Sequence, residues 1–230
     1  MSIVIPQDTR CELKGIAKGT YYPNLLIWLR THPEGFSMPY PSRTINSVYF
    51  DNYELSAYEE NLLGASSRVK VRYRWYGESR TPDAGRLEIK CKKNSYGWKL
   101  NYPVQSAPYH PGTTWHMIMD ILQCHLPFEG KRWLYEYPWP VLIIRYHRDY
   151  FISKDQRIRI TIDSRQSAFD QRYKSLPNLE RPSNFPNTVV MEIKCEKEIR
   201  ETMIQRMGNV PLRISRNSKY MIGMKSIQGY

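Results

Sequence analysis

Arginine and lysine recur at every second position in several segments of this 230-residue chain. Residues 68–75 read RVKVRYRW, so a β-strand here would carry Arg68, Lys70, Arg72 and Arg74 on one face and apolar side chains on the other. Four like charges in a row repel one another unless carboxylates or a bound anion compensate them. Guanidinium groups bind phosphate oxygens in a bidentate manner, and lysines add point charge. The pattern therefore indicates a site for a linear anion with several phosphates.

Other segments show the same alternation of charged and apolar residues. Their charged faces carry Arg10, Glu12 and Lys14; Glu88, Lys90 and Lys92; Tyr146, Arg148 and Tyr150; Arg157, Arg159, Thr161 and Asp163; and Glu192, Lys194 and Glu196. In three of these segments a glutamate stands two residues before a lysine. Such inward glutamates could pair with neighbouring cations or bind a divalent cation that bridges phosphates. We expect ion pairing for Glu12 and Glu88, and metal binding for Glu192.

The alternation by itself leaves two architectures open. One is a sheet with one solvated, charged face over an ordinary core. The other is a sheet that closes on itself with its charged faces inward, which makes a barrel lined by Arg, Lys and a few Glu. In the second case the apolar faces pack outward against helices.

Helix signals are found between the strand segments. Apolar spacing and caps predict helices at about 23–30, 53–63, 113–126 and 199–207. Asp51 or Asn52 is expected to cap the start of the second helix, and Gly64 and Gly208 are expected just past the ends of the second and fourth. Residues 170–187 contain three prolines and few periodic apolar residues, which predicts a long surface loop.

Composition narrows the class of protein. Lys and Arg number 34 against 22 Asp and Glu, a net charge of +12 that favours an anionic partner. The four cysteines and five histidines show no metal-ligand spacing, so we expect reduced packing thiols and no zinc site. No GxxxxGK[ST] motif is present, and no apolar run reaches the roughly 20 residues of a spanning helix. With no visible secretory signal, the expected location is the cytoplasm.

Taken in order, the motifs resemble the VTC (vacuolar transporter chaperone) domain, the polyphosphate polymerase domain of the triphosphate tunnel metalloenzyme, or CYTH-like, superfamily. The resemblance runs from Arg10 to Tyr220. The motifs are RCELK at 10–14, SVYFD at 47–51, RVKVRYRWYG at 68–77, LEIK at 87–90, RYHR at 145–148, RIRITID at 157–163, MEIK at 191–194 and SRNSKY at 215–220. The resemblance implies an α+β fold with one domain over residues 1–230, built as a closed antiparallel β-barrel tunnel with a charged interior and helices packed outside.

The activity that the resemblance implies is transfer of the ATP γ-phosphate to a growing inorganic polyphosphate chain, with Mn²⁺ or Mg²⁺. The residues carried over as catalytic are Arg72, Arg74, Lys90, Arg148 and Lys219. Those carried over as phosphate-binding are Arg10, Lys14, Arg68, Lys70, Tyr146, Arg159, Lys194, Arg216 and Ser218, with Glu192 as the metal ligand. Lys92, Lys93 and Lys99 would guide the product. Translocation of the product would need a membrane partner protein, and no nucleic-acid partner is expected.

The sequence also departs from related patterns. Other branches of the superfamily carry an ExExK signature near the N-terminus, and here Arg10 stands at its first position, as in VTC domains. Asn61 stands where relatives often have a basic residue. Two alternatives to a polymerase stay open at this point: a hydrolase of tripolyphosphate or nucleoside triphosphates, and a non-catalytic module that binds polyphosphate or inositol phosphates. RNA binding is the weakest option.

Overall fold

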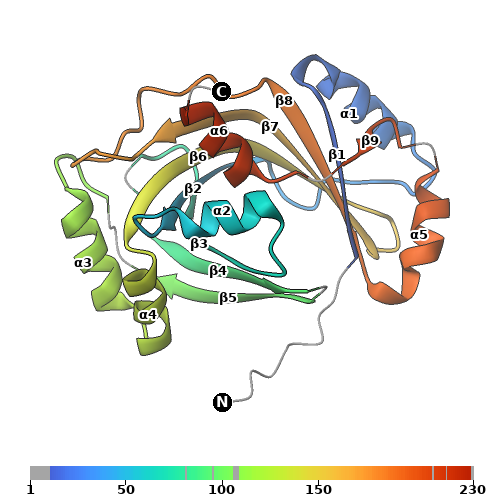
Figure 1. Ribbon diagram of the computed structural model, residues 1–230. Coiled ribbons are helices and arrows are strands. Elements are labelled where there is room, and N and C mark those ends of the chain that lie inside the picture. The colour runs from blue at the N-terminus through green and yellow to red at the C-terminus, as the bar shows by residue number, and fades with distance from the viewer. Residues whose placement is uncertain are drawn as a thin grey trace. The chain divides into compact units, whose positions relative to one another are not determined.

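Nine antiparallel strands and six α-helices make up the fold in the computed structural model, which describes residues 11–80, 82–94, 96–105, 109–208, 210–215 and 217–228 (Figure 1). The strands are β1 (Cys11–Lys18), β2 (Arg43–Asp51), β3 (Ser67–Tyr76), β4 (Gly85–Lys93), β5 (Tyr96–Val104), β6 (Trp139–Ile152), β7 (Ile158–Asp170), β8 (Thr188–Cys195) and β9 (Arg213–Ile214). The helices are α1 (Tyr22–Thr31), α2 (Ser56–Leu63), α3 (Trp115–His125), α4 (Phe128–Glu136), α5 (Arg200–Met207) and α6 (Lys219–Gln228), with 3-10 turns η1 (Gly19–Tyr21) and η2 (Lys197–Ile199).

The strands form one sheet in the order β5-β4-β3-β2-β6-β7-β8-β1-β9, and this sheet is open. The predicted closed barrel is therefore wrong. Closure would need hydrogen bonds between the two edge strands, β5 and β9. Strand β9 has only two residues and pairs with β1 at Gly15 and Ile16, while β5 contains Pro103, which lacks a backbone N–H. Both edges thus have features that stop strand pairing.

The chain packs as two compact units. The first unit comprises the described residues up to Arg43, together with Tyr146–Gln166 and Pro186–Ser218, and the second comprises Thr44–Arg145, Ser167–Phe185 and the described residues from Lys219 onward. Strands β6 and β7 contribute residues to both units.

In the second unit, strands β3 and β4 have one apolar and one charged face, as their alternation predicts. Val71, Tyr73 and Trp75 of β3 are fully buried on the apolar face. They belong to the same core cluster as Trp115, Ile118 and Leu122 of α3 and Leu134 of α4. This packing leaves the face with the arginines on the other side of the strands.

The first unit is built in the same way. Ile160 of β7 and Ile193 of β8 lie in a core with Leu25 and Leu29 of α1. Met203 and Met207 of α5 belong to the same core. In both units, helices therefore cover the apolar side of the strands, and this part of the sequence prediction is confirmed.

Asp51 connects the end of β2 with helices α2 and α6. Its carboxylate is fully buried and accepts hydrogen bonds from the backbone N–H groups of Asn52, Ala57 and Tyr58 at 2.8–3.0 Å. The Tyr220 hydroxyl of α6 donates to the same carboxylate at 2.6 Å. Asp51 thus caps the first turn of α2 and holds the start of α6 against it, and the two helices lie side by side (Figure 1).

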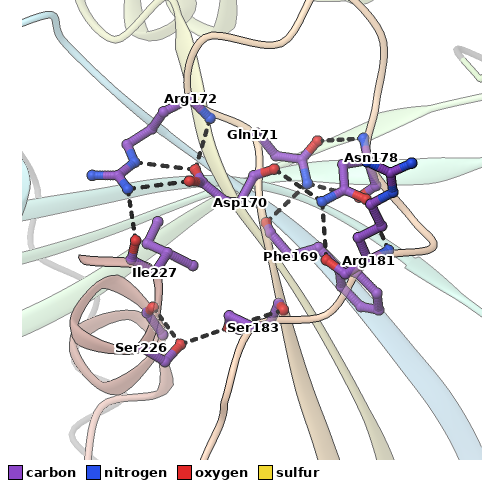
Figure 2. A network of polar contacts seen from close by, with 11 residues as sticks. Phe169, Asp170, Gln171, Arg172, Asn178, Arg181, Ser183, Ser226 and Ile227 are labelled. Atoms are coloured by element: carbon purple, nitrogen blue, oxygen red, sulfur yellow. Dashed lines mark hydrogen bonds and ion pairs between the residues drawn. The ribbon is translucent and has the colours of Figure 1, made fainter. Parts of the chain in front are cut away.

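The other end of α6 is held by the long loop that follows β7. The Arg172 guanidinium binds the Asp170 carboxylate and also donates to the Ile227 carbonyl at 2.9 Å (Figure 2). The Ser183 and Ser226 hydroxyls are 2.8 Å apart. Between Asp170 and Thr188 the chain has no helix or strand, as its prolines predict. This loop and Asp51 therefore fix both ends of α6.

The four predicted helices are present as α1, α2, α3 and α5. Gly64 has a left-handed conformation (φ 70°) at the end of α2, and Gly208 ends α5 with φ 54°. The structure begins α2 three residues later than predicted, at Ser56, whose N–H donates to the Asn52 side chain. Helices α4 and α6 have no counterpart in the sequence predictions. All four cysteines are free.

None of the helices among the described residues has the length and apolar character needed to cross a membrane.

Replacing Asp51 by Ala should lower the free energy of unfolding by about 3 kcal/mol, because several buried donors would lose their acceptor at once. Urea denaturation followed by circular dichroism measures this loss. Glu54→Ala, an exposed acidic residue in the same connection, is the matched control and should change stability by less than about 0.5 kcal/mol. Equal stability of the Asp51→Ala and Glu54→Ala variants would contradict this role of Asp51.

Candidate functional site

Arg72 stands at the centre of the charged face in the second unit. In the strand register it lies opposite Tyr49 of β2 on one side and opposite Glu88 of β4 on the other. Arg74 lies opposite Ser47, one step further along the same face. Antiparallel pairing therefore places Arg72 between a hydroxyl and a carboxylate, and brings Arg74 beside a second hydroxyl.

The Glu88 carboxylate lies close to three cationic side chains. We call this group the Glu88 cluster (Arg72, Arg74, Glu88 and Lys99). Its carboxylate is 1% exposed. Arg72 Nε lies 2.7 Å from Glu88 Oε2, Arg74 Nη1 lies 3.6 Å from the same oxygen, and Lys99 Nζ binds Oε1. One buried carboxylate thus stands among three positive charges.

The electrostatics of the Glu88 cluster show the effect of this excess charge. Burial alone would raise the pKa of the Glu88 carboxyl, but the charges of Arg72, Arg74 and Lys99 outweigh burial and lower the pKa to about 2. Burial lowers the pKa of Lys99 to about 8, because Glu88 does not fully offset the loss of hydration and the repulsion of the two guanidinium groups. Glu88 therefore stays ionised at neutral pH, Lys99 stays mostly protonated there, and an added anion near Lys99 would raise the pKa of its amine toward the ordinary value.

Further basic residues continue along β3, β4 and β5. Lys70 lies opposite Lys90, which in turn lies opposite Lys99, so three lysines share one row across three strands. In the next row, Arg68 lies opposite Lys92. Like charges directly opposite each other destabilise a sheet, and a bound polyanion relieves their repulsion.

The first unit has its own group, the Glu192 cluster (Glu12, Lys14, Arg148, Asp163, Glu192 and Lys194). Across β1 and β8, Lys14 lies opposite Glu192, and Glu12 lies opposite Lys194. Lys14 Nζ is 2.6 Å from Glu12 Oε1 and 3.6 Å from Glu192 Oε2. Lys194 Nζ is 2.5 Å from Glu192 Oε1 and 3.8 Å from Glu12 Oε2. The two lysines and two glutamates therefore form a closed network of ion pairs.

Arg148 completes the Glu192 cluster from β6. Its guanidinium binds the buried Asp163 carboxylate in a bidentate manner, at 2.5 and 2.7 Å, and lies 5.2 Å from the centre of the Tyr146 ring. Burial opposes ionisation of Glu192, but Lys14, Lys194 and Arg148 outweigh it and hold the pKa of its carboxyl far below the ordinary value. The Glu192 cluster contains as many carboxylates as cations, whereas the Glu88 cluster is positive.

Glu192 is the expected ligand of Mn²⁺ or Mg²⁺. Within the part of the chain that the structure describes, no group of three or more His, Cys, Asp or Glu side chains is arranged to hold a metal ion. Mg²⁺ usually takes one or two carboxylates together with substrate phosphates and water. Glu192 and its neighbour Glu12 thus fit a cation that arrives with phosphates, and do not make a site from protein ligands alone.

The structure brings most of the predicted site residues into these groups. The second unit holds Arg72 and Arg74 in the Glu88 cluster, with Arg68, Lys70 and Lys90 in the rows beside it. The first unit holds Lys14, Arg148, Lys194 and Glu192 in the Glu192 cluster, with Tyr146 beside Arg148.

The remaining predicted residues lie opposite a cluster member, at the start of α6, or outside the described part of the chain. Arg159 is exposed opposite Lys194. Ser218 and Lys219 stand at the start of α6. Arg10 and Arg216 lie outside the described residues.

Two expectations for individual residues can be compared with the geometry. Glu12 and Glu88 form the ion pairs expected of them. Asn61, at the position that is often basic in relatives, donates to the Ala57 carbonyl at 2.7 Å and so has a local partner within α2. Sequence reasoning assigned Tyr49 only a structural role at the end of a strand, whereas the register places it opposite Arg72 on the face with the arginines.

Comparison with known proteins identifies a family for the chain and a solved structure with a similar fold. The family model of the VTC domain matches residues 29–228. A search of curated proteins finds no significant match. A proposed adenylate cyclase from Vibrio parahaemolyticus has a similar fold, with a TM-score of 0.51 and 10% sequence identity over 93% of this chain and 96% of that chain. A chain of the Schizosaccharomyces pombe Mediator head module reaches a TM-score of 0.42 at 11% identity, over 88% of this chain and 90% of that one, which is too weak to carry an argument.

Replacing Glu88 by Gln should lower the free energy of unfolding at pH 7 by about 3 kcal/mol, because Arg72, Arg74 and Lys99 lose their buried counter-charge. The pKa of Glu88 is depressed in the folded state, so its contribution is present above the ordinary glutamate pKa and is lost as the pH falls toward 2.

Urea denaturation at pH 7 and at pH 3 measures both effects. The wild type should lose more stability between the two pH values than Glu88→Gln does. Glu129→Gln, an exposed residue of α4, is the control and should follow the wild type. The same loss of stability in Glu88→Gln and the wild type would contradict this assignment.

Proposed function

Because the chain belongs to the VTC domain family, we propose that it transfers the γ-phosphate of ATP to a growing chain of inorganic polyphosphate. The observation that supports this proposal most directly is the Glu88 cluster, in which Arg72, Arg74 and Lys99 surround one carboxylate. Guanidinium and ammonium groups on one rigid sheet face suit a linear anion with a charge on every phosphate.

The lysine and arginine rows beside the Glu88 cluster extend this surface. Lys70, Lys90 and Lys99 share a row, and Arg68 and Lys92 form the next. A polymer that repeats its charge at every phosphate can contact successive rows, whereas a single triphosphate is shorter. The rows therefore favour polyphosphate as the ligand over an isolated nucleotide.

The proposed reaction needs no covalent intermediate on the protein. A terminal oxygen of the acceptor polyphosphate attacks the γ-phosphorus of ATP in line, and the bond from that phosphorus to the β–γ bridging oxygen breaks, which releases ADP. The role of Arg72 and Arg74 is to stabilise the charge that develops on the phosphoryl oxygens and the leaving group. The sheet holds both guanidinium groups in place before the substrate arrives, since Glu88 and Ser47 already orient them.

Glu192 would bind a divalent cation together with the phosphates. Such a cation would neutralise phosphate charge. Before it binds, Lys14 and Lys194 occupy the Glu192 carboxylate. Both lysines can turn toward phosphate oxygens when the cation takes the carboxylate, so the proposal couples metal binding to phosphate binding.

Incubation of the purified protein with ATP and Mn²⁺ should yield polyphosphate chains that lengthen with time, together with ADP, on gels and in a coupled ADP assay. Arg72→Ala should reduce the rate at least about 100-fold, because a preorganised contact to the transition state is lost. Arg132→Ala removes the same side chain from the exposed surface of α4 and should leave the rate unchanged. Free phosphate without chains would indicate a hydrolase instead, and binding of tripolyphosphate without any turnover would indicate a binding module.

The metal assignment predicts a specific pattern for Glu192→Gln. Calorimetry should show that Mn²⁺ increases the affinity of the wild type for tripolyphosphate by about tenfold, whereas the affinity of Glu192→Gln should not depend on Mn²⁺. Without metal, Glu192→Gln should bind tripolyphosphate at least as tightly as the wild type, because a repelling carboxylate is gone and Lys14 and Lys194 are released. An equal effect of Mn²⁺ on both proteins would overturn the role of Glu192.

A further inference from the structure

Tyr49 lies where three cationic side chains of the second unit meet. It is on β2 directly opposite Arg72, and its side chain is almost fully buried. Arg72 and Arg74 approach it from β3, and Lys219 approaches it from the start of α6. The Arg72 guanidinium carbon is 5.9 Å from the centre of the Tyr49 ring.

The Tyr49 hydroxyl is engaged on one side only. It accepts a hydrogen bond from Arg72 Nη1 at 3.2 Å. Its own proton has no acceptor among the residues that the structure describes. A buried O–H group without an acceptor lowers the stability of a protein, so buried hydroxyls usually have one. A bound ligand could provide the acceptor for this O–H group.

The surroundings favour an anion as this partner. Burial would raise the pKa of the Tyr49 hydroxyl, but Arg72 and Arg74, with a smaller contribution from Lys219, outweigh burial and lower it. The positive charge of these three side chains makes the O–H a stronger donor and attracts an acceptor with negative charge. Arg72 and Tyr49 thus present an N–H and an O–H side by side, which matches two oxygens of one phosphate group.

The ring of Tyr49 is held in place by α6. Tyr220 stacks on it, with ring centres 4.8 Å apart and an angle of 16° between the planes. The Tyr220 hydroxyl donates to Asp51, and Tyr58 meets the Tyr220 ring edge-on at 6.3 Å. The stack fixes the direction of the Tyr49 hydroxyl before any ligand binds.

We propose that Tyr49 is a phosphate-binding residue, and that its hydroxyl donates a hydrogen bond to a non-bridging phosphate oxygen of the polyanion held by Arg72, Arg74 and Lys219. This inference rests on the proposed function, because it takes the charged face of the second unit as the polyphosphate site. Tyr220 is a positioning residue in this arrangement, since it acts on phosphate only through the orientation of Tyr49.

Calorimetric titration with tripolyphosphate, without nucleotide or metal, tests the assignment. Tyr49→Phe keeps the ring and its stack on Tyr220 and removes only the donor, so the affinity should fall about tenfold, the loss expected for one hydrogen bond to a charged group. Tyr58→Phe removes the hydroxyl of a second buried tyrosine from the same aromatic group, away from the cations, and should bind like the wild type. Near-ultraviolet circular dichroism should show that all three proteins have the same aromatic packing.

Absorbance of tyrosinate gives a readout that a merely structural role would not change. The difference between the wild type and Tyr49→Phe should show one phenol that ionises below the ordinary tyrosine pKa, and saturating tripolyphosphate should raise the pKa of that phenol, since a bound anion favours the protonated donor. The difference isolates Tyr49 from the other groups that face it or its partners: Arg72, Arg74, Glu88, Lys99, Lys219 and Tyr220.

The outcomes separate the two levels of the proposal. A wild type that does not bind tripolyphosphate would overturn the proposed function and this inference with it. Wild-type binding with equal affinity in Tyr49→Phe, or a phenol whose pKa does not respond to tripolyphosphate, would overturn the role of Tyr49 alone and leave the polymerase proposal in place.

Discussion

Repulsion among basic side chains on one face of the sheet destabilises the pairing of its strands, and the rest of the structure has to compensate for it. Alternation places Arg68, Lys70, Arg72 and Arg74 on the same side of β3, where they would separate the strands without compensation. Glu88 opposes part of this charge from within the sheet, and its burial makes each attraction stronger than it would be in water. Compensation is incomplete in the Glu88 cluster, with three cations around one carboxylate. The proposal that this face binds a polyanion rests on the remaining positive charge.

The two sides of the strands differ: one packs in the hydrophobic core, and the other carries the charged residues to which we assign phosphate binding. In each unit helices cover the apolar side, so the hydrophobic core lies on the side of the strands opposite the charged residues. Helix α6 takes part in both packing and the proposed site. Asp51 and the loop after β7 hold the helix in place, and its first turn carries Lys219 and Tyr220. A change in the packing of α6 would therefore alter the cations that meet at Tyr49. Structural and binding residues are linked here through a single helix.

The match to the VTC domain model gives the family of the chain, whereas the similarity to a solved structure gives only its fold. The family model covers most of the chain, whereas the similarity to the proposed adenylate cyclase, at 10% identity, shows the fold alone. One fold can carry many unrelated reactions, so only the residues of the site can support phosphate transfer. The two clusters differ in this respect: the Glu192 cluster balances its charges, and the Glu88 cluster does not. The proposed roles, a cation held with phosphates at Glu192 and direct phosphate contacts around Arg72, rest on this difference in charge.

Sequence by itself determined which residues share a face of each strand, where α1, α2, α3 and α5 lie, and which residues are candidates for binding phosphate. These features are local: a period of two places Arg72 and Arg74 together, and Gly64 ends α2 through its own left-handed conformation. Only the tertiary structure decided that the sheet is open, that Lys99 reaches Glu88, and that α6 carries Tyr220 onto Tyr49. Lys99 and Glu88 are 11 residues apart on consecutive strands, and the other two features depend on contacts between residues far apart in the chain. Periodicity is the same in an open and a closed sheet, because closure is settled at the edge strands, where β9 is too short and β5 contains a proline.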